Sequence, residues 1–449
     1  MDLHLLLAVL LGIGILLLLI LVARIPAFIS LLIASISVGL IAGLSGEAIM
    51  KGVQQGMAGT LGFVATVVGL GAMFGAILEH SGGARAIADF TLRKSGEKRA
   101  PIAMVLTGFL VAIPVFFDVA FIILVPMIYA LQRKTKKSLL LYAIPLLAGL
   151  AITHAFIPPT PGPIAVADII DAELGWVILC GFLVGIPTAI ISGPIFSRFI
   201  ASKIHLEAPP IQKENESNNE LPHIGIILFM IVTPIFLILF NTLLNSPICD
   251  FVQHPLFEQV RSIFKFIGHP FAALIIANLL AWYFLGIRRG VDKKRLLDII
   301  NRSMAPAGTI ILLTGAGGVF KQMLVDTGAG TMLAESLISL GIPLLVFGFI
   351  TAALIRIIQG SATVAMITAA GILAPLLVAA DYSAFDTALM VIAIASGASI
   401  LSHVNDSGFW LVSQYLGMSE KQTFRSWTMM TTVLALSGFV FSLILFLVF

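Results

Sequence analysis

Charged residues are scarce in this 449-residue chain: Asp, Glu, Lys and Arg make up 11% of it, against about a quarter of an ordinary soluble domain. Hydrophobic residues make up 59%. So little charge excludes a water-soluble fold. Apolar runs of about 20 residues, the length that spans a bilayer core as a helix, recur from end to end, among them 57–78 and 303–324. The sequence therefore predicts an all-α polytopic membrane protein.

Several chemical signatures are missing. The two cysteines, Cys180 and Cys249, form neither a disulfide framework nor a metal-ligand spacing. No G-x-x-x-x-G-K-[ST] phosphate loop occurs, so the chain carries no ATP motor of its own. The net charge of +3 comes from basic loops, which report membrane orientation and do not indicate nucleic acid. We therefore expect no metal, no cofactor and no nucleic-acid partner, and transport would need an ion gradient.

A short motif occurs twice at one constant separation, in residues 69–82 and 315–328. Both copies carry glycine, phenylalanine and leucine at matched places. An internal duplication explains this. In an apolar chain, two halves inserted in opposite directions are a common construction of secondary transporters, with the binding site at the midplane between them.

The loop charges predict two re-entrant hairpins. Basic clusters, which mark the cytoplasmic face, flank the apolar stretch 101–131 on both sides. That stretch is too long for one crossing, so we expect it to turn back near residues 114–118. Acidic residues flank the stretch 342–380 instead, which indicates a hairpin entering from the outer face, with its tip near 359–363.

Each hairpin is followed by a helix that we expect to be broken, in 139–172 and in 386–416. The first contains four prolines within six residues, which remove backbone donors. The second contains Asn-Asp-Ser-Gly from Asn405. Irregular backbone at membrane depth is tolerated where protein or a watery cavity satisfies it, although a plain loop or a helix cap would also fit these runs.

These elements divide the chain into two inverted repeats of about five membrane elements each. Residues 1–202 form the first repeat and 222–449 the second. The polar segment 203–221 is the expected cytoplasmic linker between them. Whether copies of the chain form a homo-oligomer stays open.

The hairpin tips and helix breaks supply the candidate site residues. Arg356 could clamp a carboxylate through its two-pronged donor geometry, and Asp118 and Asp406 are candidates for proton coupling because charges deep in a membrane segment are functional by default. Structural pairing of these charges and close packing of the small residues are the alternatives. The residues expected to bind substrate are Thr153, His154, Pro159, Thr160, Gly162, Arg356, Gly360, Ser361, Thr363, Asn405, Asp406 and Ser407.

Four segments together resemble the gluconate permease (gluconate:proton symporter) family, within the ion transporter superfamily. They are Thr-His-Ala-Phe-Ile-Pro-Pro-Thr-Pro-Gly-Pro from Thr153, Gly-Ala-Gly-Gly-Val-Phe from Gly315, Gly-Ser-Ala-Thr-Val-Ala from Gly360 and Ser-His-Val-Asn-Asp-Ser-Gly-Phe-Trp from Ser402. The resemblance implies a multi-pass carrier of the bacterial inner membrane that imports gluconate or a related sugar acid with protons. It also implies that the hairpin tips and broken helices form the substrate site, on a transport domain for which an elevator motion or a rocking motion is open.

This chain departs from the family pattern at two places in the expected site. Many members carry His at the position of Thr160 and a Tyr-Glu pair where this chain has Phe117 and Asp118. The departures leave open another aldonate or a shorter hydroxy acid as the substrate.

Other functions remain open from the residues alone. Sodium coupling or anion exchange would suit the same architecture, and so would a passive channel. An intramembrane hydrolase using Ser361 and His403 would lack a G-x-S-x-G or H-E-x-x-H context. We therefore expect a transporter and not an enzyme.

Overall fold

The computed structural model describes residues 3–209, 221–246, 249, 254–329, 332, 343–378, 382–404 and 406–449. Within these ranges every regular element is a helix. Seven helices of the described part are long and apolar enough to cross a membrane. The predicted all-helical polytopic fold is confirmed.

The first half of the chain runs through twelve helical segments. They are α1 (Leu3–Leu21), α2 (Ala27–Ile41), α3 (Gly46–His80), α4 (Gly83–Ser95), η1 (Glu97–Arg99), α5 (Ala100–Val111), α6 (Phe117–Thr135), α7 (Leu140–Phe156), α8 (Pro161–Ile169), α9 (Leu174–Ile190) with the π-helical η2 (Ile191–Ile195), and α10 (Phe196–Lys203).

The described part of the second half begins with three helices that have no place in the repeated pattern below. They are α11 (Ile224–Asn245), α12 (Pro255–Ile267) and α13 (Pro270–Ala281), which leads through η4 (Trp282–Gly286) into η5 (Ile287–Arg289). The chain then runs through α14 (Lys293–Asp326), α16 (Leu344–Gln359), α17 (Ala362–Val378), α18 (Ala384–Ala398), α19 (Ser407–Leu416), α20 (Glu420–Thr423), η6 (Phe424–Thr428) and α21 (Met429–Val448).

The order of elements repeats between the halves. A long helix (α3 or α14) precedes two helices joined by a tight connection (α5–α6 or α16–α17), and a helix broken in the middle follows (α7–α8 or α18–α19). The connections at 112–116 and 360–361 lie at the two expected hairpin tips, and the breaks at 157–160 and between α18 and α19 lie within the two expected broken helices. The opposite insertion of the halves and their boundaries stay predictions. Residues 210–220 of the expected linker lie outside the described ranges.

The two long helices pack along each other at glycines. A Cβ on Gly56 of α3 would lie 2.7 Å from the Gly318 carbonyl oxygen, and one on Gly318 of α14 would lie 2.6 Å from the Gly56 oxygen. Only glycine permits such contact between backbones. Both helices are longer than the apolar runs from which they were predicted. The helix α3 starts at Gly46 and not near residue 57, and α14 starts at Lys293 and not near residue 303. Glu47 and Lys51 interrupt the apolar run there without ending the helix.

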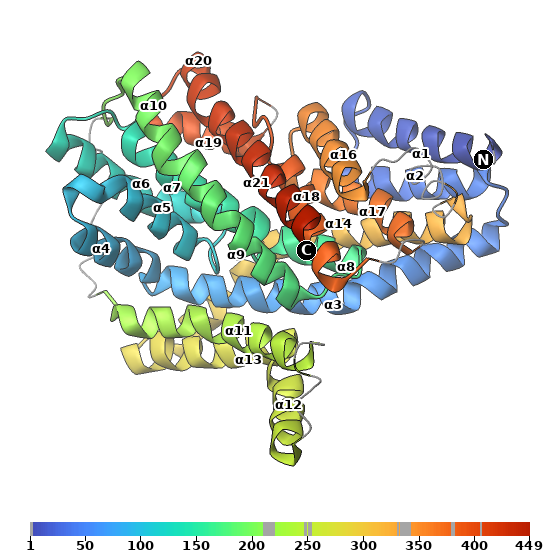
Figure 1. The fold of residues 1–449 in the computed structure, drawn as a ribbon, viewed down its shortest axis with the longest axis horizontal. Helices are drawn as coiled ribbons and strands as arrows, with labels where there is room; N and C mark the ends of the chain where they lie inside the picture. Colours follow the sequence, from blue (N-terminus) through green and yellow to red (C-terminus); the bar gives the residue numbers. More distant parts are fainter. Residues whose placement is uncertain are drawn as a thin grey trace.

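The first arms of the two broken helices, α7 and α18, lie at the centre of the molecule. Every residue of α18 from Ala388 to Ala398 is buried, and so is every residue of α7 from Tyr142 to Leu150. By contrast, α11 and α13 lie on the far side of α3 from them, with α12 projecting outward (Figure 1). Large apolar side chains such as Phe229, Phe236 and Leu279 are exposed on this outer layer, as expected where lipid replaces water. The centre of the fold is therefore where unusual backbone and buried charge meet.

Candidate substrate site

The second hairpin turns on a single glycine. Gly360 ends α16 with a φ of 91°, a left-handed conformation that residues with a Cβ rarely adopt. The next residue, Ser361, accepts a hydrogen bond from the Val364 amide at 3.4 Å and so caps the start of α17. The chain thus reverses over two residues, and the last turn of α16 comes to lie beside the turn itself.

Arg356 occupies that last turn, and its side chain is 4% exposed. Its Nη2 donates to the Asp406 carboxylate at 2.5 Å, and its Nη1 donates to the carbonyl oxygen of Gly360. Within the described residues its Nε has no hydrogen-bond partner. A buried cation of this kind is costly unless it is paired. The pair therefore fastens the second hairpin to the second helix break.

Asp406 ends that break and starts the next helix. Its Oδ1 accepts from the Gly408 amide at 3.1 Å, the usual role of an aspartate at a helix N-cap. Its Oδ2 accepts from Arg356 and also from the Ser402 hydroxyl. One carboxylate therefore caps α19, pairs with the hairpin arginine and accepts a hydrogen bond from Ser402 within the same break.

The break is held in place from η6 and α21. Trp427 Nε1 donates to the Ser402 hydroxyl at 2.6 Å, and the Thr428 hydroxyl donates to the Ser402 carbonyl at 2.5 Å. The Ser402 amide donates to the Thr431 hydroxyl at 3.1 Å. Ser402 and Trp427 are not among the site residues predicted from the sequence. Only the run beginning at Ser402 could have drawn attention to them, because their pairing joins positions far apart in the chain.

The first hairpin reaches the same place from the other half. Asp118 lies in the first turn of α6, near enough to Asp406 for the two carboxylates to interact electrostatically. Beside it, the Phe117 ring lies 5.6 Å from the Trp427 ring, centre to centre. The two carboxylates expected to couple protons therefore influence each other electrostatically, although they come from different halves of the chain.

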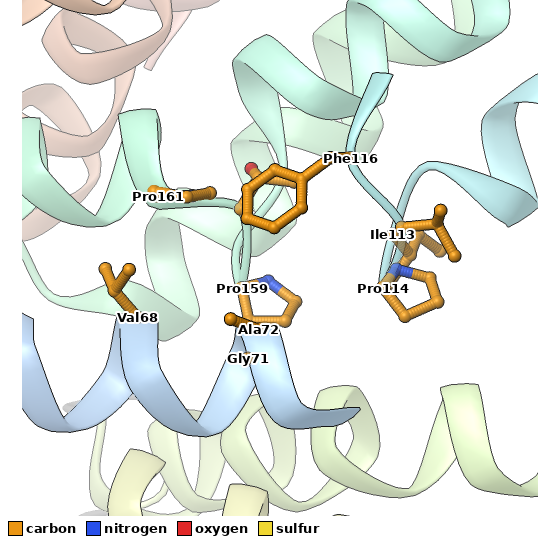
Figure 2. Close-up of a pocket in the computed structure, with 10 residues that line it drawn as sticks. Val68, Gly71, Ala72, Ile113, Pro114, Phe116, Pro159 and Pro161 are labelled. Carbon is orange, nitrogen blue, oxygen red and sulfur yellow. The ribbon is translucent and has the colours of Figure 1, made fainter. Parts of the chain in front are cut away.

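A second group of predicted residues gathers at the first helix break, over α3. Figure 2 shows Phe116 of the hairpin tip reaching over Pro159 and Pro161, above Gly71 on α3. They line a cavity of about 10 Å³, room for roughly one water molecule and far too small for a sugar acid. Thr160 also lines it and donates to the Ile157 carbonyl at 2.6 Å.

Glycines of the repeated motif allow this close assembly. A Cβ on Gly75 would lie 2.0 Å from the Pro114 carbonyl oxygen, and one on Gly71 would lie 3.2 Å from that of Pro159. The hairpin tip and the proline break therefore rest directly on the α3 backbone. The second copy of the motif makes a similar close contact, since a Cβ on Gly317 would lie 2.6 Å from the side chain of Ile367 in α17. Both copies therefore lie where a long helix packs closely against its neighbours.

The remaining predicted residues that the structure describes fall into three groups. Thr153 Oγ1 and His154 Nδ1, at the end of α7, are buried without a hydrogen-bond partner among the described residues. Gly162 lies against Met366 of α17, which joins the first break to the second hairpin. Thr363 and Ser407 lie in the first turns of α17 and α19, where Thr363 is half-buried and Ser407 exposed. Asn405 lies outside the described residues.

Comparison with known proteins identifies the family. Residues 4–448 match the family described as GntP family permease. The chain belongs to this family. The family expected from the motifs is thereby confirmed. As a GntP family permease the chain is a membrane transporter and not an enzyme, with a multi-pass location in the bacterial inner membrane.

Relatives align with this GntP family permease over nearly its whole length. The "Low-affinity gluconate transporter" of Escherichia coli K12 is 40% identical over 432 residues, which is 96% of each chain. The "Gnt-II system L-idonate transporter" of the same organism is 36% identical over 430 residues, 95% of each. Among solved structures, the Alcanivorax borkumensis YdaH transporter aligns with a TM-score of 0.67 at 16% identity, over 93% of this chain and 97% of that one. That likeness shows a shared fold.

Proposed function

We propose that this permease imports gluconate or a closely related sugar acid together with protons. The observation that carries the proposal is the buried guanidinium of Arg356, held at a hairpin tip beside a helix break. A planar guanidinium recognises a carboxylate by two parallel hydrogen bonds. No such cation is needed to pack a hairpin, and burying one is costly.

Backbone around the arginine suits an anion as well. The helices α17 and α19 both begin beside it, and helix N-termini carry free amides and partial positive charge. Thr153, Ser361 and Thr363 offer hydroxyl groups that could bond the hydroxyls of a sugar acid. On this proposal the arginine binds the carboxylate of the substrate, and the hydroxyl-bearing residues of both halves select its chain.

The relatives support a six-carbon sugar acid, since they are named for gluconate and for L-idonate. These two acids differ in the configuration of hydroxyl groups and share the carboxylate. We therefore expect recognition to centre on the carboxylate, with Thr160 and Phe117 tuning preference among aldonates and shorter hydroxy acids.

The charges support coupling to protons. Asp118 interacts electrostatically with Asp406, which pairs with Arg356, so an arriving anion would meet negative charge there. Binding a proton to one of them offsets that repulsion. Opposite insertion of the two halves would then place this centre near the membrane midplane.

Uptake into proteoliposomes tests the proposal. We expect labelled gluconate to accumulate under an inward proton gradient, with no requirement for sodium, and unlabelled aldonates to compete with it. Uptake that needs sodium and ignores the pH gradient would overturn proton coupling. Entry without accumulation would indicate a passive channel. Transport of another aldonate in place of gluconate would correct the named substrate and leave sugar acid transport standing.

A further inference from the structure

We propose that Asp406 competes with the substrate for Arg356. In the substrate-free protein its carboxylate holds the arginine, and the substrate carboxylate replaces it as Asp406 takes up the coupling proton. The inference rests on the proposed function, because it assigns the order of proton and substrate within the same site. On this proposal the coupling proton binds to Asp406 and not to Asp118.

The ion pair between Asp406 and Arg356 uses only one of the two donors on one edge of the guanidinium. A guanidinium presents Nε and Nη2 on one edge, and a carboxylate with two free oxygens can occupy both. Asp406 occupies only Nη2, and the buried Nε beside it has no partner among the described residues. The other oxygen of Asp406 is committed to the Gly408 amide. A substrate carboxylate has no such commitment, so it can make the two-pronged contact that Asp406 cannot.

A proton on Asp406 has a hydrogen-bond acceptor within reach, the oxygen of Ser402. Oδ2 now accepts from the Ser402 hydroxyl, which also receives the Trp427 indole N–H. Once Oδ2 carries a proton and leaves Arg356, the Ser402 hydroxyl hydrogen rotates away from Oδ2, and Oδ2 can then donate to the second lone pair of the Ser402 oxygen. Oδ1 can keep the Gly408 amide throughout. The exchange therefore breaks one ion pair, forms another and leaves the cap of α19 intact.

The charges around Asp406 also favour its protonation when the substrate binds. Three ionisable side chains surround Asp406: Arg356 of α16, Asp118 of α6, and His403 within the break, whose Nε2 is 2.8 Å from the Ile357 carbonyl. If the substrate took Arg356 from an ionised Asp406, three carboxylates would face one cation. One proton on Asp406 removes that imbalance. Among the described residues the ion pair of Arg356 is with Asp406 and not with Asp118, so Asp406 is the carboxylate that gives up its cation when the substrate binds.

The test is calorimetric titration of the purified protein with gluconate, in buffers of different ionisation enthalpy. For the wild type we expect uptake of about one proton per gluconate bound, and an affinity that falls about tenfold per pH unit in the alkaline range. Asp406→Asn mimics the protonated group and keeps an oxygen for the Gly408 amide. We expect this variant to bind gluconate at alkaline pH more tightly than the wild type, with no proton uptake.

Two further variants make the result specific. Asp298→Asn changes an exposed carboxylate, paired with Arg302 far from the site, and should behave as the wild type. Asp118→Asn should retain proton uptake on binding. Proton uptake that persists in Asp406→Asn, or that disappears in Asp118→Asn instead, would overturn the inference.

The outcomes also separate this inference from the proposed function. A wild type that binds gluconate with no proton uptake refutes the exchange at Asp406 and leaves sugar acid binding intact. A wild type that binds no sugar acid at any pH refutes the proposed function itself. Loss of all binding in a folded Asp406→Asn, with the wild type active, would make Asp406 a direct ligand and not a competitor.

Discussion

Arg356 and Asp406 form a buried ion pair across 2.5 Å, with side chains 4% and 15% exposed. The arginine belongs to the second hairpin and the aspartate to the second helix break. Because the arginine lies in the last helical turn before the hairpin turn and the aspartate is the N-cap after the break, the contact joins the two irregular parts of this half. It is also the point that Asp118 reaches from the first half.

Replacing Arg356 should damage binding according to what the new side chain retains. Arg356→Lys keeps the charge and loses the two-pronged geometry, so we expect KM for gluconate to rise at least about tenfold. Arg356→Ala leaves Asp406 buried without its partner and should destabilise the protein by about 3–5 kcal/mol. Uptake kinetics and thermal unfolding in detergent measure the two effects. Arg302→Lys, in an exposed pair with Asp298, is the matched control, and an equal effect there would contradict the assignment.

Removing the indole donor of Trp427 should loosen the break without emptying the core. Trp427→Phe keeps a ring against Phe117 and loses the hydrogen bond to Ser402. One such bond is worth about 1 kcal/mol, so KM should rise roughly fivefold while the amount of folded protein stays the same. Trp176→Phe on α9 should leave KM unchanged. If both variants shift KM alike, Trp427 acts only through packing.

The repeated glycine motif contains its own control. Gly75→Ala would place a Cβ 2.0 Å from the Pro114 carbonyl oxygen, whereas a Cβ on Gly69 meets nothing within 4 Å. We expect Gly75→Ala to cost about 1–3 kcal/mol of stability and to slow uptake, because the hairpin tip must move off α3. Gly69→Ala should be neutral or slightly stabilising. Equal unfolding temperatures for the two variants would contradict the close contact.

Opposite insertion of the halves predicts opposite accessibility of two loops. In a background with Cys180 and Cys249 replaced, a cysteine at Lys136 should react with a membrane-impermeant reagent only from the cytoplasmic side. A cysteine at Ser383, the N-cap of α18, should react only from the outside. Labelling of both from the same side would refute the inverted arrangement.

Local chemistry made much of the fold predictable. Prolines and glycines change the conformation of the backbone at their own positions. Both helix interruptions, at the proline run around Pro159 and at the turn on Gly360, could therefore be located from the sequence. The α3 helix was underestimated because polar residues such as Glu47 ended the apolar run but not the helix. Hydrophobicity measures what lipid can cover, whereas helix length also depends on partners such as α14.

The site was predictable only in part. Arg356 and Asp406 could be singled out individually, because each is a charge placed where charge is costly. Their pairing could not, since it joins positions in different helices through the tertiary fold. The same holds for Trp427 and Ser402, whose hydrogen bond depends on how η6 packs against the break. A serine and a tryptophan carry no charge that would mark them in an apolar sequence.

Proton movement driven by the substrate alone tests the central claim most directly. Proteoliposomes that contain a trapped pH-sensitive dye, with no initial gradient and no sodium, receive gluconate from outside. The account predicts acidification of the interior that follows gluconate entry and is abolished in Arg356→Lys at low gluconate concentration. Entry of labelled gluconate with no change in internal pH would contradict it.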